Sequence, residues 1–390
     1  MATSLLMGEK FGKKNGLCFL QVFIIQYRSM AKFIGSMYRR VFKPILFLCD
    51  AEKVHDAFTS TGVFLGKYKT MRAITRGLFA YKNPRLEQTV LGIKFANPVG
   101  LSAGFDKDAK LTDIMPEVGF GFEEVGSITG EPCEGNPKPR LWRLPKLGAL
   151  VVHYGLKNEG CEKIAARLST KKFKLPIGTN IAKTNNVACA ETEAGIADYA
   201  KAFNMLKNTG DYFTVNISCP NAYGGEPFTD PARLDLLLAR LDVIPTKKPV
   251  FLKFSPDLTT ERLDALIDVC SRHRVHGFIC TNLTKEKKEE NEIRLKGGLS
   301  GRIVKKLSDD QIAYIYQKTK GKYVIIGVGG VFTAKDAFHK IQLGATLVEL
   351  ITGMVFEGPQ LIGEINRGLV KLMDQHGFKT IAEAVGTEKV

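Results

Sequence analysis

The stretch PVFLKFS, residues 249–255, is one of eight short apolar runs that decide the fold of this chain. Strands that are buried on both faces have such continuous apolar sequences, and their alternation with helical segments implies parallel pairing. The runs span residues 98–104, 122–128, 176–183, 212–218, 249–255, 277–282, 323–330 and 347–352. Eight in succession predict an α/β fold, a closed (β/α)8 TIM barrel.

The alternative fold is an open, doubly wound parallel sheet. That fold usually carries a G-x-G-x-x-G motif after its first strand, and none follows residues 98–104. A chain of 390 residues is longer than the ~250 of a plain barrel, which leaves room for an N-terminal extension. We expect a basic and apolar leader at 1–30, an amphipathic helical segment at 31–85 and the barrel at 86–390.

The segment 31–48 has the spacing of an amphipathic helix. Its apolar residues recur at steps of three and four: Phe33, Met37, Val41, Ile45 and Leu48. Pro44 is expected to kink or divide this helix. Asp50 is a good N-cap for a second, short helix that runs towards Gly62.

Charge favours a membrane surface as the partner of these helices. The formal net charge is +16, and no acidic residue lies between Lys10 and Cys49. The apolar run Leu17–Ile25 is shorter than the ~20 residues that cross a bilayer. A basic helix pair with Phe-rich apolar faces fits the membrane interface, although two such helices could also form a lid on the barrel.

The eight cysteines form no C-x-x-C pair and no Cys/His cluster with the spacing of metal ligands. We therefore expect a reducing compartment and no metal site. Most of these cysteines are expected to be small buried side chains.

Polar residues gather at the ends of six predicted strands. In a barrel of this kind, catalytic groups lie at the C-terminal ends of the strands. A single such residue is more often a satisfied core group or a turn residue, but six strand ends together favour an active site. The groups are Ser102 to Lys107, Gly126-Ser127, Asn180 with Lys183, Asn216 to Asn221, Lys253, and Thr281-Asn282.

The last two strands end in Gly329-Gly330 and Thr352-Gly353. Barrels commonly bind a phosphate group at this place, on backbone N–H groups. The glycine-rich segment Gly297 to Gly301 is expected to be another loop that approaches the same ligand closely.

Lys253 lies among Phe251, Leu252 and Phe254, so its charge must face solvent or an anionic partner in the barrel mouth. A reduced flavin carries such a negative charge, which the lysine would stabilise. A Schiff-base lysine of an aldolase would need the same residue type. The residues alone leave both interpretations open.

Five motifs resemble those of dihydroorotate dehydrogenases, and their order covers residues 32 to 375. They are SAGFDK (102–107), EGNPKPR (134–140), NISCPN (216–221), GGLSG (297–301) and IGVGG (326–330). The N-terminal helices make the chain similar to the membrane-associated, quinone-using branch of that family.

The resemblance implies one flavin mononucleotide (FMN) and oxidation of dihydroorotate to orotate in pyrimidine biosynthesis, with Cys219 as the catalytic base. Electrons would pass to a quinone near His55 and Arg143. It implies substrate contacts from Lys107, Tyr154, Gly155, Asn216, Asn221 and Asn282. It implies FMN contacts from Ala103, Gly104, Ser127, Asn180, Asn216, Lys253, Thr281, Ser300, Gly301, Gly329, Gly330, Ile351 and Thr352.

The same branch implies a peripheral protein on the cytoplasmic face of a bacterial plasma membrane, or on the mitochondrial inner membrane of a eukaryote. Related FMN barrels reduce uracil rings in tRNA, which the charge of +16 would suit. Those enzymes usually bring a separate RNA-binding domain, and none is recognisable after residue 360. No nucleic-acid partner is expected.

Three positions depart from the family pattern. Cys219 stands where the quinone branch usually has Ser, and a thiol that titrates near ~8.5 would be a better base than an alcohol. Val152 replaces an Asn that contacts substrate, and Ile351 replaces a Tyr near the quinone end. A different pyrimidine-like substrate, or fumarate or NAD as acceptor, therefore remains an alternative.

Overall fold

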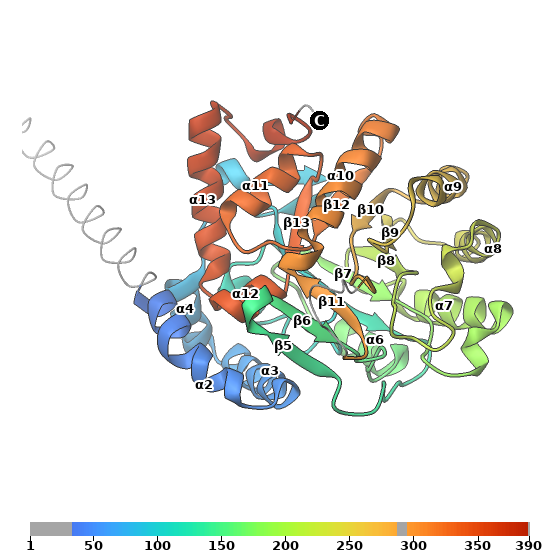
Figure 1. The fold of residues 1–390 in the computed structure, drawn as a ribbon, viewed down its shortest axis with the longest axis horizontal. Helices are drawn as coiled ribbons and strands as arrows, with labels where there is room; N and C mark the ends of the chain where they lie inside the picture. Colours follow the sequence, from blue (N-terminus) through green and yellow to red (C-terminus); the bar gives the residue numbers. More distant parts are fainter. Residues whose placement is uncertain (1–32, 287–294, 389–390) are drawn as a thin grey trace, which may run out of the picture.

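In the computed structural model, which describes residues 33–286 and 295–388, eight parallel strands form a closed barrel. Its strands are β3 (Val99–Leu101), β4 (Phe122–Ile128), β7 (Ile177–Ile181), β8 (Tyr212–Asn216), β9 (Val250–Phe254), β10 (Gly277–Cys280), β12 (Val324–Val328) and β13 (Leu347–Leu350). The strands follow chain order around the barrel, and Figure 1 labels those from β7 to β13 with the helices around them.

The eight predicted strands are confirmed, but all except β4 are shorter than predicted. Ser102 to Gly104, for example, lie beyond the end of β3. The polar residues at the predicted strand ends therefore lie mostly on the loops that follow the strands, where side chains can turn towards a ligand.

Helices surround the barrel and bury their apolar faces against it. Asp230, Thr259 and Thr333 cap three of them, each accepting a backbone N–H in the first turn. The helices are α5 (Met115–Val118), α6 (Cys161–Ser169), α7 (Thr192–Leu206), α8 (Pro231–Asp242), α9 (Thr260–Ser271), α10 (Lys305–Thr319), α11 (Ala334–Gln342), α12 (Thr352–Glu357) and α13 (Leu361–His376).

Aromatic rings fill one end of the barrel interior. Phe95, Phe122, Tyr212 and Phe251 belong to one buried cluster, to which the hairpin of β1 (Gln88–Val90) and β2 (Ile93–Phe95) contributes. Gly100 makes room for this packing, because a Cβ atom there would overlap the ring of Phe122. This end is closed, so a cavity can form only at the other end.

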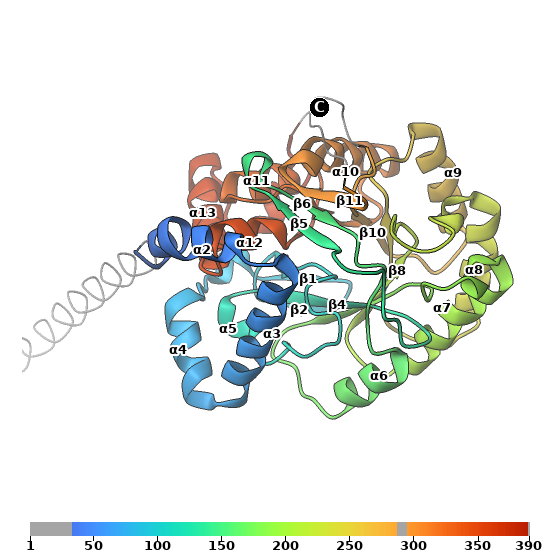
Figure 2. The same cartoon turned by 60° about the horizontal axis from the view of Figure 1, so that its bottom comes forward.

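A three-stranded antiparallel sheet lies across the barrel (Figure 2). Its strands are β5 (Leu141–Leu144), β6 (Ala149–Val152) and β11 (Gly298–Gly301). None of these three strands was predicted from the sequence. The prediction of a loop at Gly297 to Gly301 is wrong for residues 298–301, because they pair with β6.

The N-terminal segment contains one helix more than predicted. A π-helical turn (Tyr38–Phe42) leads into α2 (Lys43–Leu48), which is followed by α3 (Ala51–Lys67) and α4 (Lys69–Phe79). All of these helices lie together at one side of the barrel (Figure 2). The leader predicted for 1–30 lies outside the described residues.

The predicted division at Pro44 is confirmed, because a π-helical turn ends at Phe42 and α2 begins at Lys43, with Pro44 in its first turn. The predicted end near Gly62 is wrong. A Cβ atom at Gly62 would lie 2.7 Å from Leu111 Cδ2, so this glycine allows α3 to pack closely on the barrel. The N-cap role of Asp50 is confirmed, since its side chain accepts the N–H of Lys53.

A buried ion pair joins α3 to the loop before β5. Arg140 Nη2 lies 2.8 Å from Glu52 Oε1, and both side chains are buried. Arg140 Nη1 also donates to the carbonyl oxygens of Glu134 and Asn136, each at 2.8 Å. Burial alone would raise the pKa of Glu52, but the hydrogen bonds and charge of Arg140 outweigh it and lower the pKa.

Removal of one partner of this pair is expected to destabilise the protein strongly. Arg140→Met leaves Glu52 buried without its main partner, which should cost about 3–5 kcal/mol of unfolding free energy. The double variant Glu52→Leu/Arg140→Met should recover much of that loss. Chemical denaturation measures both effects.

The exposed pair Lys94–Glu87, with an N–O distance of 3.0 Å, offers a matched control. Lys94→Met should change the unfolding free energy by no more than about 1 kcal/mol. If Arg140→Met lowered the unfolding free energy no more than Lys94→Met does, the stabilising role of the buried pair would be contradicted.

Candidate active site

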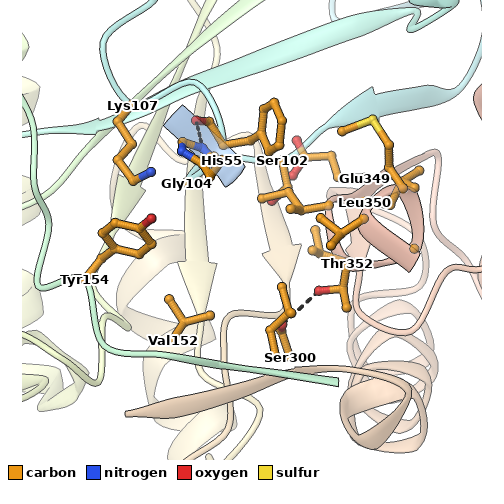
Figure 3. A pocket seen from close by; sticks show the side chains of 18 of the residues that line it. His55, Ser102, Gly104, Lys107, Val152, Tyr154, Ser300, Glu349, Leu350 and Thr352 are labelled. Carbon is orange, nitrogen blue, oxygen red and sulfur yellow. Dashed lines mark hydrogen bonds between the residues drawn. The ribbon is translucent and has the colours of Figure 1, made fainter. Parts of the chain in front are cut away.

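A cavity of about 440 Å³ lies between the loops after the barrel strands, the three-stranded sheet and α3. The predicted site residues line this cavity, with the exception of Asn180. Figure 3 shows Ser300 and Thr352 on one side and Lys107, Tyr154 and Val152 on the other. Asn180 is buried in β7, where its Nδ2 lies 3.5 Å from Glu124 Oε1.

Glycines and hydroxyls form one side of the cavity. Gly329 and Gly330 have φ angles of +123° and +71°, which glycine adopts at little cost. A Cβ atom at Gly330 would overlap the side chain of Lys305. The hydroxyls of Ser300 and Thr352 lie 2.8 Å apart, at the edge of β11 and the start of α12. This combination suits a phosphate group, which binds hydroxyls and closely approaching backbone.

Lys253 lies at the floor of the cavity and is buried. Its Nζ donates to Ser102 Oγ at 3.3 Å and lies 4.0 Å from Glu124 Oε2. A carboxyl group of the protein, and not solvent alone, therefore lies beside this ammonium group. Glu124 and Glu349 were not predicted as site residues, although each lies within an apolar strand as Lys253 does, so the same reasoning applies to them.

Three amide side chains line the other side, and two of them, those of Asn216 and Asn282, are hydrogen-bonded to each other. Asn216 Nδ2 donates to Ser127 Oγ at 2.9 Å, and Asn282 Nδ2 donates to Asn216 Oδ1 at 3.1 Å. Asn221 Nδ2 donates to the carbonyl oxygen of Val152 at 2.9 Å. Such a group can bind the alternating donors and acceptors of a planar cyclic amide.

His153 also belongs to this group, and the sequence analysis assigned it no role. Its Nδ1 lies 3.3 Å from Asn221 Oδ1. With Nδ2 held by Val152 and Oδ1 facing His153, both ends of the Asn221 amide have a defined orientation. No motif in the sequence linked His153 to Asn221.

Cys219 lines the same cavity as these amides. Burial raises the pKa of its thiol to about 11, and the charge of Glu226 adds to this effect. The expectation that it titrates near ~8.5 is therefore wrong. Only a small fraction of this thiol is ionised at neutral pH. A larger thiolate fraction requires either high pH or a bound ligand that changes the surroundings of the thiol.

Lys107, Tyr154 and His55 form the boundary towards α3. Lys107 Nζ lies 4.1 Å from the centre of the Tyr154 ring. Burial lowers the pKa of Lys107 to about 8 and that of His55, with help from the Lys107 charge, to about 4. His55 Nε2 lies 3.1 Å from the carbonyl oxygen of Phe105. The imidazole is therefore neutral at physiological pH.

Apolar side chains line the part of the cavity below the N-terminal helices, among them Phe58, Leu65, Phe79 and Met115. Arg143 stands at its polar edge, where its guanidinium lies 4.9 Å from the Phe47 ring centre and donates to the carbonyl oxygen of Cys49 at 2.8 Å. Val152 and Ile351 add aliphatic surface.

Comparisons with known proteins agree with this geometry. A family model described as dihydroorotate dehydrogenase matches residues 85–373. The "Dihydroorotate dehydrogenase (quinone)" of Trichodesmium erythraeum (strain IMS101) is 38% identical over 90% of this chain and 98% of its own. That of Christiangramia forsetii (strain DSM 17595 / CGMCC 1.15422 / KT0803) is 40% identical over 86% of this chain and 99% of its own.

Solved structures show the same likeness. Ligand-free DHODH from Eimeria tenella superposes with a TM-score of 0.77 at 28% identity, covering 87% of this chain and 99% of that one. The complex of DHODH with ferulenol from the same organism has a TM-score of 0.76, also at 28% identity, and covers 87% of this chain and 95% of that one. With the family model and full-length relatives in agreement, the chain belongs to the dihydroorotate dehydrogenase family, among relatives named as quinone-dependent.

Proposed function

We propose that this protein oxidises dihydroorotate to orotate in pyrimidine biosynthesis and passes the electrons to a quinone. One observation carries this proposal: a single cavity has an amide group with Cys219 at one end and an apolar region below α3 at the other. The first end suits a planar pyrimidine and the second a hydrophobic electron acceptor. The relatives named as quinone-dependent dehydrogenases support both assignments.

The cofactor in this proposal is FMN, which supplies the two-electron redox chemistry that amino-acid side chains lack. The residues present fit it. Gly329, Gly330, Ser300, Gly301 and Thr352 would hold its phosphate, because positive-φ glycines and hydroxyls leave space and donors for that group. The cationic Lys253 on the cavity floor would favour a ring system that becomes negatively charged.

Other residues would hold the flavin ring and its side chain. Those we assign to it are Ala103, Gly104, Ser127, Asn180, Asn216, Thr281 and Ile351. Of these, Asn180 would act from beneath the cavity floor, since it does not line the cavity. The aldolase alternative for Lys253 loses support because the family match points to redox chemistry.

For the substrate, we assign the amide recognition to Asn216, Asn221 and Asn282. Lys107, cationic below a pKa of about 8, would pair with the substrate carboxylate. Tyr154 and Gly155 would border the ring. Cys219 would take the proton from the substrate carbon, which requires its thiolate form.

The acceptor would enter between the N-terminal helices, past the neutral His55 and along Arg143. The helical segment 33–79 carries exposed apolar side chains on an otherwise basic stretch, including Phe33, Phe42, Leu48, Phe64 and Ile74. This surface suits peripheral binding to a membrane, where quinones dissolve. No described helix is long and apolar enough to cross a membrane.

We propose the cytoplasmic face of a bacterial plasma membrane as the location, or the mitochondrial inner membrane in a eukaryote. The division of the chain into a leader (1–30), a helical access segment (31–85) and a catalytic barrel (86–390) follows the same assignment.

Anaerobic reduction tests the reaction directly. The purified protein should be yellow, and dihydroorotate should bleach it without oxygen. A short-chain ubiquinone should then restore the oxidised spectrum much faster than fumarate or NAD, each added to a separate sample. A flavin that stays oxidised with dihydroorotate would contradict the substrate, and faster reoxidation by fumarate or NAD would contradict the acceptor.

Substitution of Cys219 tests the base. Cys219→Ala should keep FMN but slow flavin reduction by dihydroorotate at least about 100-fold, the usual contribution of a positioned base. Because the thiolate is the active form and its pKa is raised to about 11, the wild-type rate of flavin reduction at saturating dihydroorotate should rise with pH from 6 to 10, while the affinity for dihydroorotate should fall above about pH 8, where Lys107 loses its charge. Stopped-flow spectroscopy measures both.

The exposed Cys49 provides a matched control, and Cys49→Ala should reduce flavin at the wild-type rate. Wild-type kinetics in Cys219→Ala would instead mean that Cys219 is a packing residue.

A further inference from the structure

Two buried carboxyl groups lie under Lys253, and the proposed reaction gives them no role. Glu124 belongs to β4 and Glu349 to β13, on opposite sides of β3 in the barrel. Both side chains are completely buried. Glu349 lines the cavity, and Figure 3 shows it beside Ser102.

The contacts of the two carboxyls leave them short of donors. Glu124 Oε1 faces Asn180 Nδ2 at 3.5 Å, and Glu124 Oε2 lies 4.0 Å from Lys253 Nζ. Neither oxygen of Glu349 has a hydrogen-bond partner at normal distance among the described residues, although the hydroxyl of Ser102 lies close enough to favour the ionised form and the carboxyl of Glu124 close enough to favour the protonated one. Buried carboxylate oxygens without donors are costly, whereas a carboxylic acid brings a donor of its own.

The local charges indicate the same protonation state. The charged or titratable groups that act on Glu349 are Glu124 and Lys253, and the phenol of Tyr212 faces both carboxyls. Burial raises the pKa of Glu349 well above its usual range, the charge of Glu124 raises it further, and Lys253 lowers it. Two adjacent buried carboxyls cannot both ionise beside one cation without a large cost.

We infer that Glu349 is a positioning residue for Lys253: it shares one proton with Glu124, and the single negative charge of the pair holds the ammonium group at the cavity floor. The floor is then electrically neutral while Lys253 keeps its charge. The consequence for redox chemistry rests on the proposed binding of FMN above this lysine.

A shared proton makes a distinctive prediction for substitutions. In Glu349→Gln, Glu124 alone carries the negative charge, and in Glu124→Gln, Glu349 carries it. Each single variant should therefore leave the midpoint potential of bound FMN at pH 7 equal to that of wild type. The double variant removes the charge altogether and leaves the charge of Lys253 uncompensated.

In the double variant, the affinity for reduced flavin should therefore rise at least tenfold relative to the affinity for oxidised flavin. For a two-electron couple, this ratio corresponds to a positive shift of the midpoint potential by about 30 mV. Equilibrium reduction with a reference dye measures it. Glu123→Gln is the matched control, because Glu123 is also completely buried on β4 but does not line the cavity, and its carboxyl faces Asp106. It should leave the potential unchanged.

Other patterns of midpoint potentials among these variants would overturn the inference. A positive shift in each single variant would mean that both carboxyls are ionised, and no shift in the double variant would mean that neither carries charge. A protein without flavin would instead contradict the proposed function.

Infrared spectroscopy provides a readout that needs neither flavin nor the double variant. In difference spectra against wild type at pH 7, Glu349→Gln and Glu124→Gln should lose the same C=O stretch of a buried protonated carboxyl, whereas Glu123→Gln, which removes another buried carboxyl with a raised pKa, should lose a separate band and keep this one. Persistence of this band in both single variants would also contradict a shared proton.

Discussion

The closure of eight parallel strands into one barrel is the constraint on which the site depends. Parallel pairing brings the C-terminal ends of all eight strands to one rim. Rings such as Phe122 and Tyr212 fill the other end, so space remains only at that rim. Residues as distant in sequence as Lys107 and Thr352 therefore line one cavity. The sheet of β5, β6 and β11 and the helix α3 then enclose it.

The strands and most of the site could be predicted from the sequence because their signals are local. Apolar runs mark the strands, and polar residues at the end of a strand or directly after it mark the rim, as Asn216 and Thr281 do. The β11–β6 pairing could not be predicted, since Gly298–Gly301 and Ala149–Val152 are far apart in the chain and the glycines resemble a loop. The length of α3 was not predicted either, because the helix continues past Gly62 to Lys67, where a glycine fits against Leu111 and does not end the helix.

Burial sets the chemistry of this rim as much as residue identity does. By its usual pKa, the thiol of Cys219 would be a better base than an alcohol. Burial raises that pKa and keeps the thiol protonated, and the same burial would exclude water from a bound substrate. Lys253 is buried only because carboxyls lie beside it. The charge of each group thus depends on its neighbours, and a bound ligand would change several of them at once.

The central claim is that one cavity holds a flavin between a pyrimidine site and an apolar acceptor site. A crystal structure of the protein with FMN and orotate tests it most directly. The account predicts the FMN phosphate at Gly329-Gly330 and Ser300, the flavin ring next to Lys253, and orotate among Asn216, Asn221 and Asn282 near Cys219. Orotate bound on the side of His55 and Arg143, or a phosphate bound elsewhere, would contradict it.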